Sequence, residues 1–350
     1  MTATGPEKEV VHMGSTADGT VLRVTDLRTY FHTGQGIFRA VDGVDLTLRS
    51  GRTLGLVGES GSGKSLTAFS ILRLTDRSAR IQEGSRVEFG GRDLVSLSEK
   101  EMAAIRGRDI SMIFQEPMTA LNPVHRVGAQ VAEPLRRHLG MRRREAAERA
   151  VELLDLVGIR DARARARDYP HQFSGGMLQR VVIAMALACE PRVLLADEPT
   201  TALDVTIQEQ ILTLLRRLQD RFATAVLLIT HDLGVVAQSC DDVAVMYAGR
   251  VVETGPVARV FSAPRHPYTR ALLATTPTLD SSAPLVPIPG TVPDSRHWPV
   301  GCRFAERCPS VMPRCRQEYP PMEGSGTARA ACWLPVAFPR SAGTVETVAS

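Results

Sequence analysis

The sequence TLGLVGESGSGKS, residues 53–65, joins a short apolar run to a turn rich in glycine and serine. The apolar run predicts a buried strand, and an apolar helix is expected from Leu66 onward. Between them, Gly58 to Ser65 match the pattern G-x-x-x-x-G-K-[ST] in the context that the pattern requires. The glycines allow backbone N–H groups to turn toward phosphates, and the start of the helix adds positive potential. The stretch therefore predicts a nucleotide-binding loop.

The polar side chains of this loop have expected tasks. Lys64 reaches the β and γ phosphates, and the hydroxyl of Ser65 binds Mg²⁺. A purely structural glycine turn is the alternative, but the strand, the lysine and the helix together disfavour it. We expect the nucleotide to contact Gly58, Ser60, Gly61, Ser62, Gly63, Lys64, Ser65 and Leu66.

A second stretch, residues 173–204, reads FSGGMLQRVVIAMALACEPRVLLADEPTTALD and places two acids at the end of an apolar strand. A buried carboxylate is costly unless a cation compensates it. Asp197 would hold Mg²⁺ through the water shell of the metal, and Glu198 would orient or deprotonate an attacking water. The alternative is a pair of acids exposed to solvent at the end of a strand. The nucleotide-binding loop earlier in the chain favours the metal site.

The second stretch also contains a serine and two glycines, Ser174, Gly175 and Gly176, at the start of a helix. Such a start leaves several N–H donors pointing outward, which suits a phosphate. Taken alone, the three residues indicate only a helix cap.

Length and composition limit the possible classes of protein. With 350 residues, of which 43% are hydrophobic, the chain is long enough for one large domain and a smaller one. Its 42 basic and 38 acidic side chains leave a formal charge of +4, which is too mild to indicate nucleic acid as a partner. No apolar run reaches the roughly 18 residues of a membrane span, and no signal-peptide pattern is visible. We therefore expect a cytoplasmic protein.

Continuous apolar strands such as RVLLAD and AVLLIT predict a parallel sheet covered on both faces, and thus an α/β fold. Residues 118–177 change to a helical pattern and predict a helical insertion. We expect flexible tails at residues 1–20 and 341–350, a nucleotide-binding domain at 21–262 and a smaller C-terminal domain at 263–340.

Six motifs that follow one another along the chain resemble those of the ATP-binding-cassette (ABC) ATPases, and the resemblance covers residues 21–262. Gly58 to Ser65 resembles the Walker A motif, FSGGM the signature and VLLADE the Walker B motif. Gln115 in IFQEP resembles the Q-loop, ALD at 202–204 the D-loop, and His231 in ITHD the switch histidine. The resemblance implies an ATPase that binds ATP and Mg²⁺. It also implies a P-loop NTPase core with an antiparallel β subdomain and a helical subdomain.

The resemblance further implies that two ATPase domains pair head to tail. Ser174, Gly175 and Gly176 would then contact the γ-phosphate bound by the partner, and Asp204 would act across the interface. Taken singly, these residues are more simply interpreted as helix caps. Phe173 and Met177 stand where the family usually has Leu and Gln, which puts close positioning of the phosphate in doubt.

Within one domain, the resemblance gives catalytic roles to three side chains. Gln115 would approach Mg²⁺ and the attacking water, and His231 would bind the γ-phosphate and position Glu198. A strand-end amide and a capping histidine are the plain alternatives. The aromatic that stacks on adenine is expected to be Phe31, with Tyr30 as the alternative, although ordinary core packing accounts equally well for either ring.

The C-terminal part carries the more specific resemblance. HPYTRALLATTP, IPGTVPD and GCRFAERCP resemble the ATPase subunits of bacterial dipeptide and oligopeptide importers. This resemblance implies a heterodimer with a second, similar ATPase, two membrane-spanning permeases and an external peptide-binding protein. The chain would then lie peripherally at the cytoplasmic face of the inner membrane, with residues 115–123 near the permeases.

Four cysteines, Cys302, Cys308, Cys315 and Cys332, lie in a proline-rich segment with little core of its own, which predicts a metal staple. Their spacing lacks C-x-x-C pairs and leaves zinc and iron–sulfur equally open, with four free thiols as a third alternative. The resemblance to peptide importers favours a [4Fe–4S] cluster over Zn²⁺. Cys189 and Cys240 lie in apolar helical contexts and are expected in the core.

An ABC-type ATPase of DNA repair or chromosome organisation is the alternative function. Such proteins separate the nucleotide-binding loop from the signature by long coiled coils or zinc inserts. The interval from Gly58 to Ser174 is short and contains no heptad repeat, so it favours the importer.

Overall fold

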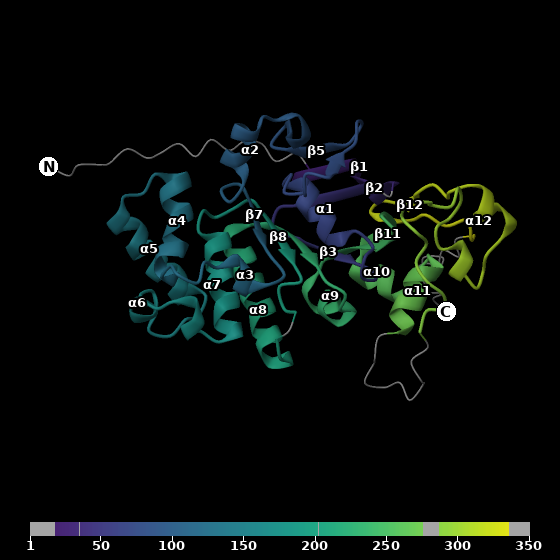
Figure 1. Cartoon of the computed structure of the whole chain (residues 1–350). Helices are drawn as coiled ribbons and strands as arrows, with labels where there is room; N and C mark the ends of the chain where they lie inside the picture. Colours follow the sequence, from purple (N-terminus) through teal and green to yellow (C-terminus); the bar gives the residue numbers. More distant parts are fainter. Residues whose placement is uncertain (1–17, 35, 202, 276–286, 336–350) are drawn as a thin grey trace, which may run out of the picture.

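The computed structural model describes residues 18–34, 36–201, 203–275 and 287–335 (Figure 1). The expected C-terminal tail and most of the expected N-terminal tail lie outside the described residues. Within the described part, none of the helices combines the length and the apolar character that a bilayer span requires.

An eight-stranded sheet forms the centre of the molecule, in the order β12-β13-β11-β10-β3-β9-β8-β7. The pairs from β10 to β7 are parallel, and their strands are buried almost without interruption. The parallel sheet predicted from continuous apolar runs is therefore confirmed. Its parallel strands are β3 (Thr53–Val57), β7 (Ile110–Ile113), β8 (Val193–Asp197), β9 (Ala225–Ile229) and β10 (Asp242–Tyr247).

A second sheet is antiparallel and has the order β2-β1-β5-β6, with β4 also paired to β1. Its strands are β1 (Thr20–Thr33), β2 (Gly36–Arg49), β4 (Ala79–Ile81), β5 (Arg86–Phe89) and β6 (Arg92–Asp93). In β1 and β2, buried and more exposed residues alternate along much of each strand, as expected for strands with one face on a core.

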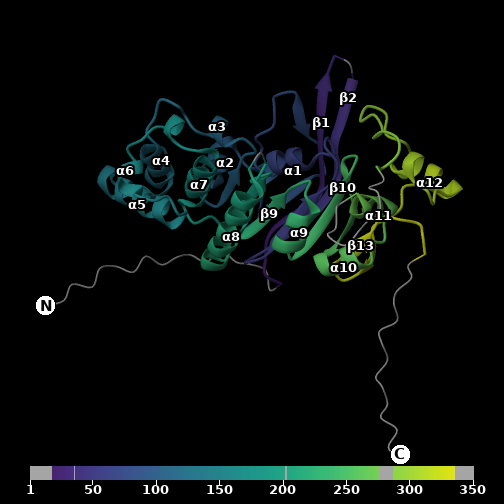
Figure 2. The same cartoon turned by 90° about the horizontal axis from the view of Figure 1, so that it is seen from below.

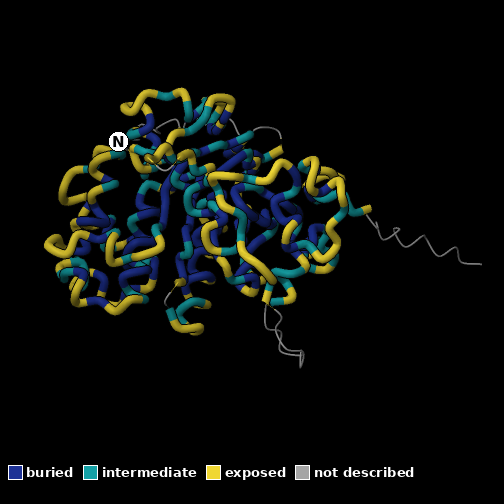
Figure 3. The backbone as a smooth tube through the Cα atoms, turned by 45° about the vertical axis from the view of Figure 1, so that its right-hand side comes forward, coloured by how far each residue is buried: buried dark blue, intermediate teal, exposed yellow. Residues whose placement is uncertain are grey.

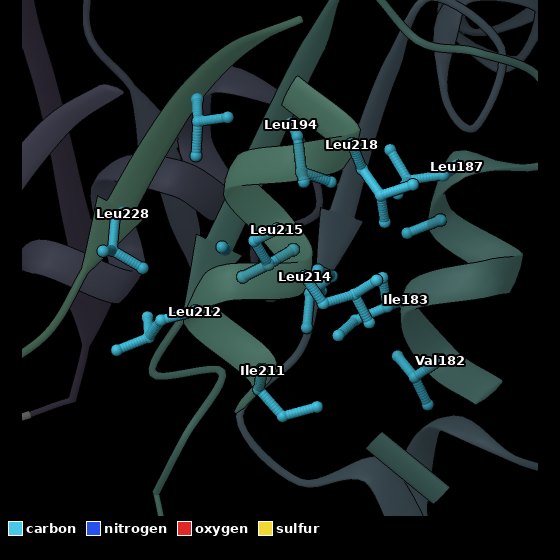
Figure 4. Close-up of a cluster of buried hydrophobic side chains, with 14 of the residues drawn as sticks. Val182, Ile183, Leu187, Leu194, Ile211, Leu212, Leu214, Leu215, Leu218 and Leu228 are labelled. Carbon is cyan, nitrogen blue, oxygen red and sulfur yellow. The ribbon is translucent and has the colours of Figure 1, made fainter. Parts of the chain in front are cut away.

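Neighbouring residues of the parallel strands face two different hydrophobic cores. Leu194 and Leu228 belong to one core, and Leu195 and Leu227 belong to the other. Figure 4 shows the first core, where Leu194 and Leu228 lie against the apolar side chains of α7 and α8. The sheet is therefore covered on both faces, and Figure 3 shows the buried interior beneath a more exposed surface.

The helices that supply these cores follow the expected strand–helix alternation. They are α1 (Lys64–Ile71), α2 (Glu99–Ile105), α7 (Gly175–Leu187), α8 (Val205–Phe222), α9 (Leu233–Ser239) and α10 (Val257–Ser262). A short 3-10 helix, η1 (Leu94–Ser96), precedes α2.

A group of helices lies to one side of the central sheet, at the left of Figures 1 and 2. The apolar faces of α4 and α5 contact α7 and join the first core. Apart from Pro117 at its start, this region falls within the helical insertion expected at residues 118–177, whose limits stay a prediction. Its elements are α3 (Pro117–Ala120), α4 (Val127–Leu139), α5 (Arg143–Leu156), α6 (Ala162–Arg165) and the 3-10 helix η2 (Pro170–Gln172).

The C-terminal segment packs back onto the nucleotide-binding part. Strand β13 pairs with β11 and so extends the central sheet, while Tyr268 and Phe304 are buried in the first core. The boundary expected near residue 263 stays a prediction, and the described residues beyond it form no core of their own. The elements of this region are β11 (Arg250–Pro256), α11 (Pro267–Ala274), η3 (Ala305–Arg307), α12 (Pro313–Gln317), β12 (Glu323–Ser325) and β13 (Ala328–Ala330).

Candidate functional site

The predicted nucleotide-binding loop connects β3 to α1, as its sequence context requires. Gly58 and Gly63 have φ angles of 155° and 102°. A Cβ atom at Gly58 would lie 2.1 Å from the carbonyl oxygen of Met246, and one at Gly63 would lie 2.5 Å from that of Ala40. Only glycine allows the loop to pass so close to the neighbouring backbone. A Cβ at Gly61 meets nothing within 4 Å, so that position is open.

Two polar side chains of the loop lack the partners that a phosphate would supply. The hydroxyl of Ser62 is buried and has no hydrogen-bond partner within the described residues. The Lys64 ammonium, in a side chain that is 7% exposed, donates to the carbonyl oxygens of Gly58 (2.8 Å) and Glu59 (3.0 Å). Burial lowers the pKa of Lys64, while the nearby carboxylates oppose that shift. Both groups fit a phosphate anion, because it would accept from the hydroxyl and pair with the ammonium.

Ser65, at the start of α1, lies close to Asp197, the last residue of β8. The Ser65 hydroxyl donates to Oδ1 of Asp197 at 2.9 Å, and Asp197 is 2% exposed. Burial raises the pKa of Asp197, and the neighbouring charge of Glu198 raises it further. A hydroxyl and a buried carboxylate are oxygen donors of the kind that Mg²⁺ prefers. These two residues therefore fit the expected magnesium site.

Glu198 lies directly after β8 and has a φ of 45°, which is uncommon for a residue other than glycine. Its Oε2 accepts hydrogen bonds from Gln115 (3.2 Å) and from the hydroxyl of Thr201 (2.7 Å). Its Oε1 lies 3.2 Å from Nδ1 of His231. Burial raises the pKa of Glu198, but the hydrogen bonds from Thr201 and His231 outweigh burial, and the pKa is lowered. The carboxylate is therefore ionised at neutral pH and held from several directions.

The signature residues occupy a different part of the molecule. Ser174 is the N-cap of α7, and its hydroxyl accepts from the N–H of Met177 at 3.4 Å. Ser174 and Gly175 are exposed, and a Cβ at Gly175 would meet nothing within 4 Å. Helix α7 lies apart from α1 in both views of the chain (Figures 1 and 2).

The remaining predicted site residues lie at element ends and on the antiparallel sheet. Asp204 is the N-cap of α8 and accepts from the N–H of Ile207 at 3.0 Å. Tyr30 donates its hydroxyl to the carboxylate of Asp42, so that ring is fixed by a polar contact. Phe31 is half-buried opposite Phe38 on β2 and has no polar tether.

The structure thus joins five of the predicted residues in two hydrogen-bonded groups at one edge of the sheet. One group is Ser65 with Asp197, and the other is Glu198 with Gln115 and His231. Sequence reasoning missed Thr201, which donates to Glu198. Its position three residues after that acid, in a turn where the Thr201 N–H donates to the Glu198 carbonyl, was the available signal.

The four C-terminal cysteines line one pocket, together with His266, Phe304 and Trp333. The N–H of Cys302 donates to the carbonyl of Cys315 at 2.7 Å, and a Cβ at Gly301 would lie 2.1 Å from that carbonyl, so only glycine fits there. Burial raises the pKa of Cys302 to about 11 and also raises the pKa values of Cys308 and Cys332. Among the described residues, no three His, Cys, Asp or Glu side chains are arranged to hold a single metal ion.

The other two cysteines follow helices, Cys189 in the turn after α7 and Cys240 at the end of α9, and of the two only Cys240 has the expected place in a core. Cys240 is buried against the first core, and burial raises its pKa to about 12. Cys189 is partly buried, and burial raises its pKa to about 11.

Comparison with known proteins identifies two family regions. Residues 41–201 match the family described as ABC transporter, and residues 252–315 match the one described as oligopeptide/dipeptide transporter, C-terminal region. The chain is 52% identical over 318 residues to the oligopeptide transport ATP-binding protein OppD of Salmonella typhimurium, which covers 90% of this chain and 94% of the relative. It is 53% identical over 317 residues to the dipeptide transport ATP-binding protein DppD of Bacillus subtilis, with the same shares.

Solved structures agree with this similarity. An ATP-binding cassette solved as a dimer in a post-hydrolysis state, bound to ADP and phosphate, superimposes with a TM-score of 0.61 at 29% identity. The match covers 68% of this chain and 99% of the cassette. The α/β fold expected from the sequence is therefore confirmed as that of the ABC ATPases, and nothing in the comparisons favours the DNA-repair alternative. The chain belongs to the family of ATP-binding proteins of peptide ABC transporters.

Proposed function

We propose that this chain is the ATP-hydrolysing subunit of a dipeptide or oligopeptide importer, and that it converts ATP binding and hydrolysis into movement of membrane permeases. The observation that carries the proposal is the meeting of Lys64, Ser65, Asp197 and Glu198 where the nucleotide-binding loop faces the end of β8. The strong identity to peptide-transport proteins over nearly the whole chain supports the cargo class.

Each residue of this group has a task in the proposed reaction. Lys64 would leave the loop carbonyls and pair with the phosphates of ATP. Ser65 and Asp197 would hold Mg²⁺, which when bound neutralises charge that develops on the transferred phosphoryl group. Glu198, ionised and bound by Thr201 and His231, would orient the attacking water and accept its proton. Gln115, which donates a hydrogen bond to Glu198, would keep the carboxylate and the attacking water aligned with each other.

A second, similar ATPase would complete the site. Ser174, Gly175 and Asp204 are exposed at helix starts, and Val205 is 82% exposed beside Asp204. Exposed N–H donors at the start of α7 suit a phosphate held on another subunit. We infer a head-to-tail heterodimer in which each chain supplies the signature for the ATP bound by its partner.

The permeases would contact the segment that follows Gln115. Met118 and Val124 are 72% and 75% exposed, and both are apolar. Apolar side chains exposed next to a residue that contacts Glu198 suit a surface that receives a membrane partner. The chain would therefore lie at the cytoplasmic face of the inner membrane, and the permeases would receive peptides from an external peptide-binding protein.

Phe31 is proposed to stack on adenine. Tyr30 is tied to Asp42 by its hydroxyl, and the pKa of Tyr30 is raised to about 12 by burial and by that contact. Phe31 is the neighbouring ring without such a tether, so it is better placed to accept an adenine face.

The cysteine pocket is proposed to hold a [4Fe–4S] cluster. The support for the cluster is that all four cysteines line one pocket, because a cubic cluster takes four thiolates, each bound to a different iron. Its role would be structural or sensory, because ATP hydrolysis needs no redox centre.

Nucleotide binding and membrane association test the proposal together. The tagged full chain should bind Mg-ATP, and it should co-purify from its own cells with two membrane permeases. Lys64→Ala should abolish ATP binding and leave co-purification intact. Purification with nucleic acid instead of permeases, or unchanged ATP binding in Lys64→Ala, would contradict the proposal.

A further inference from the structure

One residue of the nucleotide-binding loop, Glu59, is held by the C-terminal segment. Both oxygens of its carboxylate accept from Arg307, with Nη1 to Oε2 at 2.8 Å and Nη2 to Oε1 at 2.9 Å. The Arg307 side chain is 5% exposed and lies 248 positions later in the chain. A two-pronged contact from a buried arginine fixes a carboxylate in direction as well as in distance.

The backbone of Glu59 is held from the same side. Its N–H donates to the hydroxyl of Tyr268 at 2.8 Å. Tyr268 is fully buried, and its ring packs against Tyr247 and Phe304 at centroid distances of 4.6 and 5.5 Å. Because the ring is packed, the position of the Tyr268 hydroxyl is fixed. The hydroxyl therefore fixes the position of the Glu59 N–H and of the loop at that point.

Arg307 is itself held by the C-terminal segment and by the end of β10. Its Nε donates to the carbonyl of Pro289 at 2.8 Å, and its guanidinium lies 5.7 Å from the centre of the Tyr247 ring. It ends η3, directly before Cys308. The contact with Glu59 is therefore built by the C-terminal segment, which lies 209 and 248 positions later in the chain at Tyr268 and Arg307.

The orientation of Glu59 matters for the rest of the loop. Its carbonyl oxygen accepts from Lys64 (3.0 Å) and from the N–H of Ser62 (3.2 Å). The N–H of Glu59 points to Tyr268, and its carbonyl points to Lys64 and Ser62. The orientation of Glu59 therefore sets the position of the Lys64 ammonium and of the turn at Ser62.

We propose that Arg307 and Tyr268 are positioning residues for the nucleotide-binding loop. They hold Glu59 from outside the loop, so the affinity of the site for ATP depends on the C-terminal segment. This inference rests on the proposed function, in which the loop binds ATP. It assigns to the C-terminal segment a task at the ATP site that neither its sequence motifs nor its cysteines suggested.

The test compares four single variants of the full chain by titration with a fluorescent ATP analogue and Mg²⁺. Tyr268→Phe removes only the hydroxyl. Arg307→Lys keeps the positive charge but cannot donate the two parallel hydrogen bonds to Glu59. Arg307→Gln removes the charge. Arg316→Gln is the matched control, because it breaks the ion pair of Arg316 with Glu306, which is exposed on the same segment and does not reach the loop.

We expect the dissociation constant to rise about tenfold in Arg307→Gln and about threefold to fivefold in Tyr268→Phe. Arg307→Lys should fall between Arg307→Gln and the wild type, and Arg316→Gln should equal the wild type. The number of sites per chain should stay at one in each variant. A merely structural role would instead reduce the number of sites and leave the affinity of the remaining ones unchanged.

Glu59→Gln and the double variant Glu59→Gln/Arg307→Gln complete the design. If the two side chains act through each other, the double variant binds ATP no more weakly than the weaker single variant. Affinities within twofold of the wild type in both Tyr268→Phe and Arg307→Gln would overturn the inference while the wild type still binds ATP. A wild type that fails to bind ATP would instead overturn the proposed function.

Discussion

The hydroxyl of Ser65 lies 2.9 Å from Oδ1 of Asp197, although 132 positions separate the two residues in the chain. The contact arises because β3 and β8 flank β9 in one parallel sheet, so the residues that follow or end these strands meet at the same edge. The buried carboxylate of Asp197 therefore lies beside the start of α1. The reactions proposed for this chain depend on that meeting.

Glu198→Gln should slow ATP hydrolysis by at least about 100-fold, because a positioned general base contributes roughly 10² to 10⁴ in rate. The amide keeps the shape of the carboxylate but cannot accept a proton from water. ATP affinity should change little, since the loop from Gly58 to Ser65 is untouched. Phosphate release by the assembled complex and nucleotide titration of the full chain measure the two effects.

Glu209→Gln is the matched control for this variant, because Glu209 is an exposed acid on α8. It should hydrolyse ATP at the wild-type rate. Hydrolysis by Glu198→Gln within a few-fold of the wild type would remove Glu198 from the role of base.

Gly175→Asp should distinguish the role of the signature from that of the chain's own ATP site, because it should impair only the site that the partner completes. A Cβ at this position meets nothing within 4 Å, and an acid in the first turn of a helix is favourable, so α7 should fold normally. The added carboxylate would repel the phosphate of a partner's ATP. We expect unchanged ATP affinity in the isolated chain and hydrolysis by the assembled complex reduced about tenfold or more.

Melting temperature provides the control for Gly175→Asp, and it should stay within a few degrees of the wild type. Weaker ATP binding by the isolated variant would mean that the signature contributes to its own chain's site, contrary to the head-to-tail arrangement.

Stability should fall as the pH drops from 6.5 toward 3, in part because of His266. Burial lowers the pKa of this fully buried histidine from 6.5 to about 3, and its Nδ1 accepts from the N–H of Tyr268. Between these pH values His266 is protonated in the unfolded chain and neutral in the folded chain. The contribution of His266 therefore falls by up to about 1.4 kcal/mol for each pH unit below 6.5.

His266→Asn isolates this effect, because the asparagine oxygen still caps α11 but does not titrate. Glu253, which accepts from the N–H of His266, has a pKa raised by burial and gives an opposite slope above its ordinary pKa, but it is present in both proteins. The difference between the two free energies of unfolding should shrink as the pH falls. Parallel curves from pH 7 to 5 would show that His266 is not the titrating group.

Cys308→Ser should remove bound iron and the brown absorbance at about 400 nm that thiolate–iron clusters give. Cys189→Ser is the control, because Cys189 lies outside the cysteine pocket and should leave both signals unchanged. Anaerobic purification followed by metal analysis measures the outcome. Colourless wild-type protein that carries zinc would overturn the cluster.

The sequence predicted those parts of the site that depend on local geometry. The loop from Gly58 to Ser65 and the acid pair after β8 each follow a strand, and the ends of parallel strands meet by the rules of the fold. Their contacts could therefore be foreseen without knowing the remainder of the chain.

The contacts of the C-terminal segment could not be foreseen. Glu59 meets Arg307 and Tyr268 across 248 and 209 positions, and no periodicity or spacing connects such residues. The pairing of β13 with β11 has the same character, because three-residue strands leave almost no pattern in a sequence. These contacts depend on how the segment folds back, which only the structure gives.

Uptake of labelled di-, tri- and pentapeptides into vesicles that contain the complete transporter tests the central claim most directly. With ATP supplied on the side of this chain, the wild-type complex should accumulate at least one of these peptides. A complex that contains Glu198→Gln should bind ATP and accumulate none. Equal accumulation by both complexes, or accumulation without ATP, would contradict the claim that Glu198-dependent hydrolysis powers the transport.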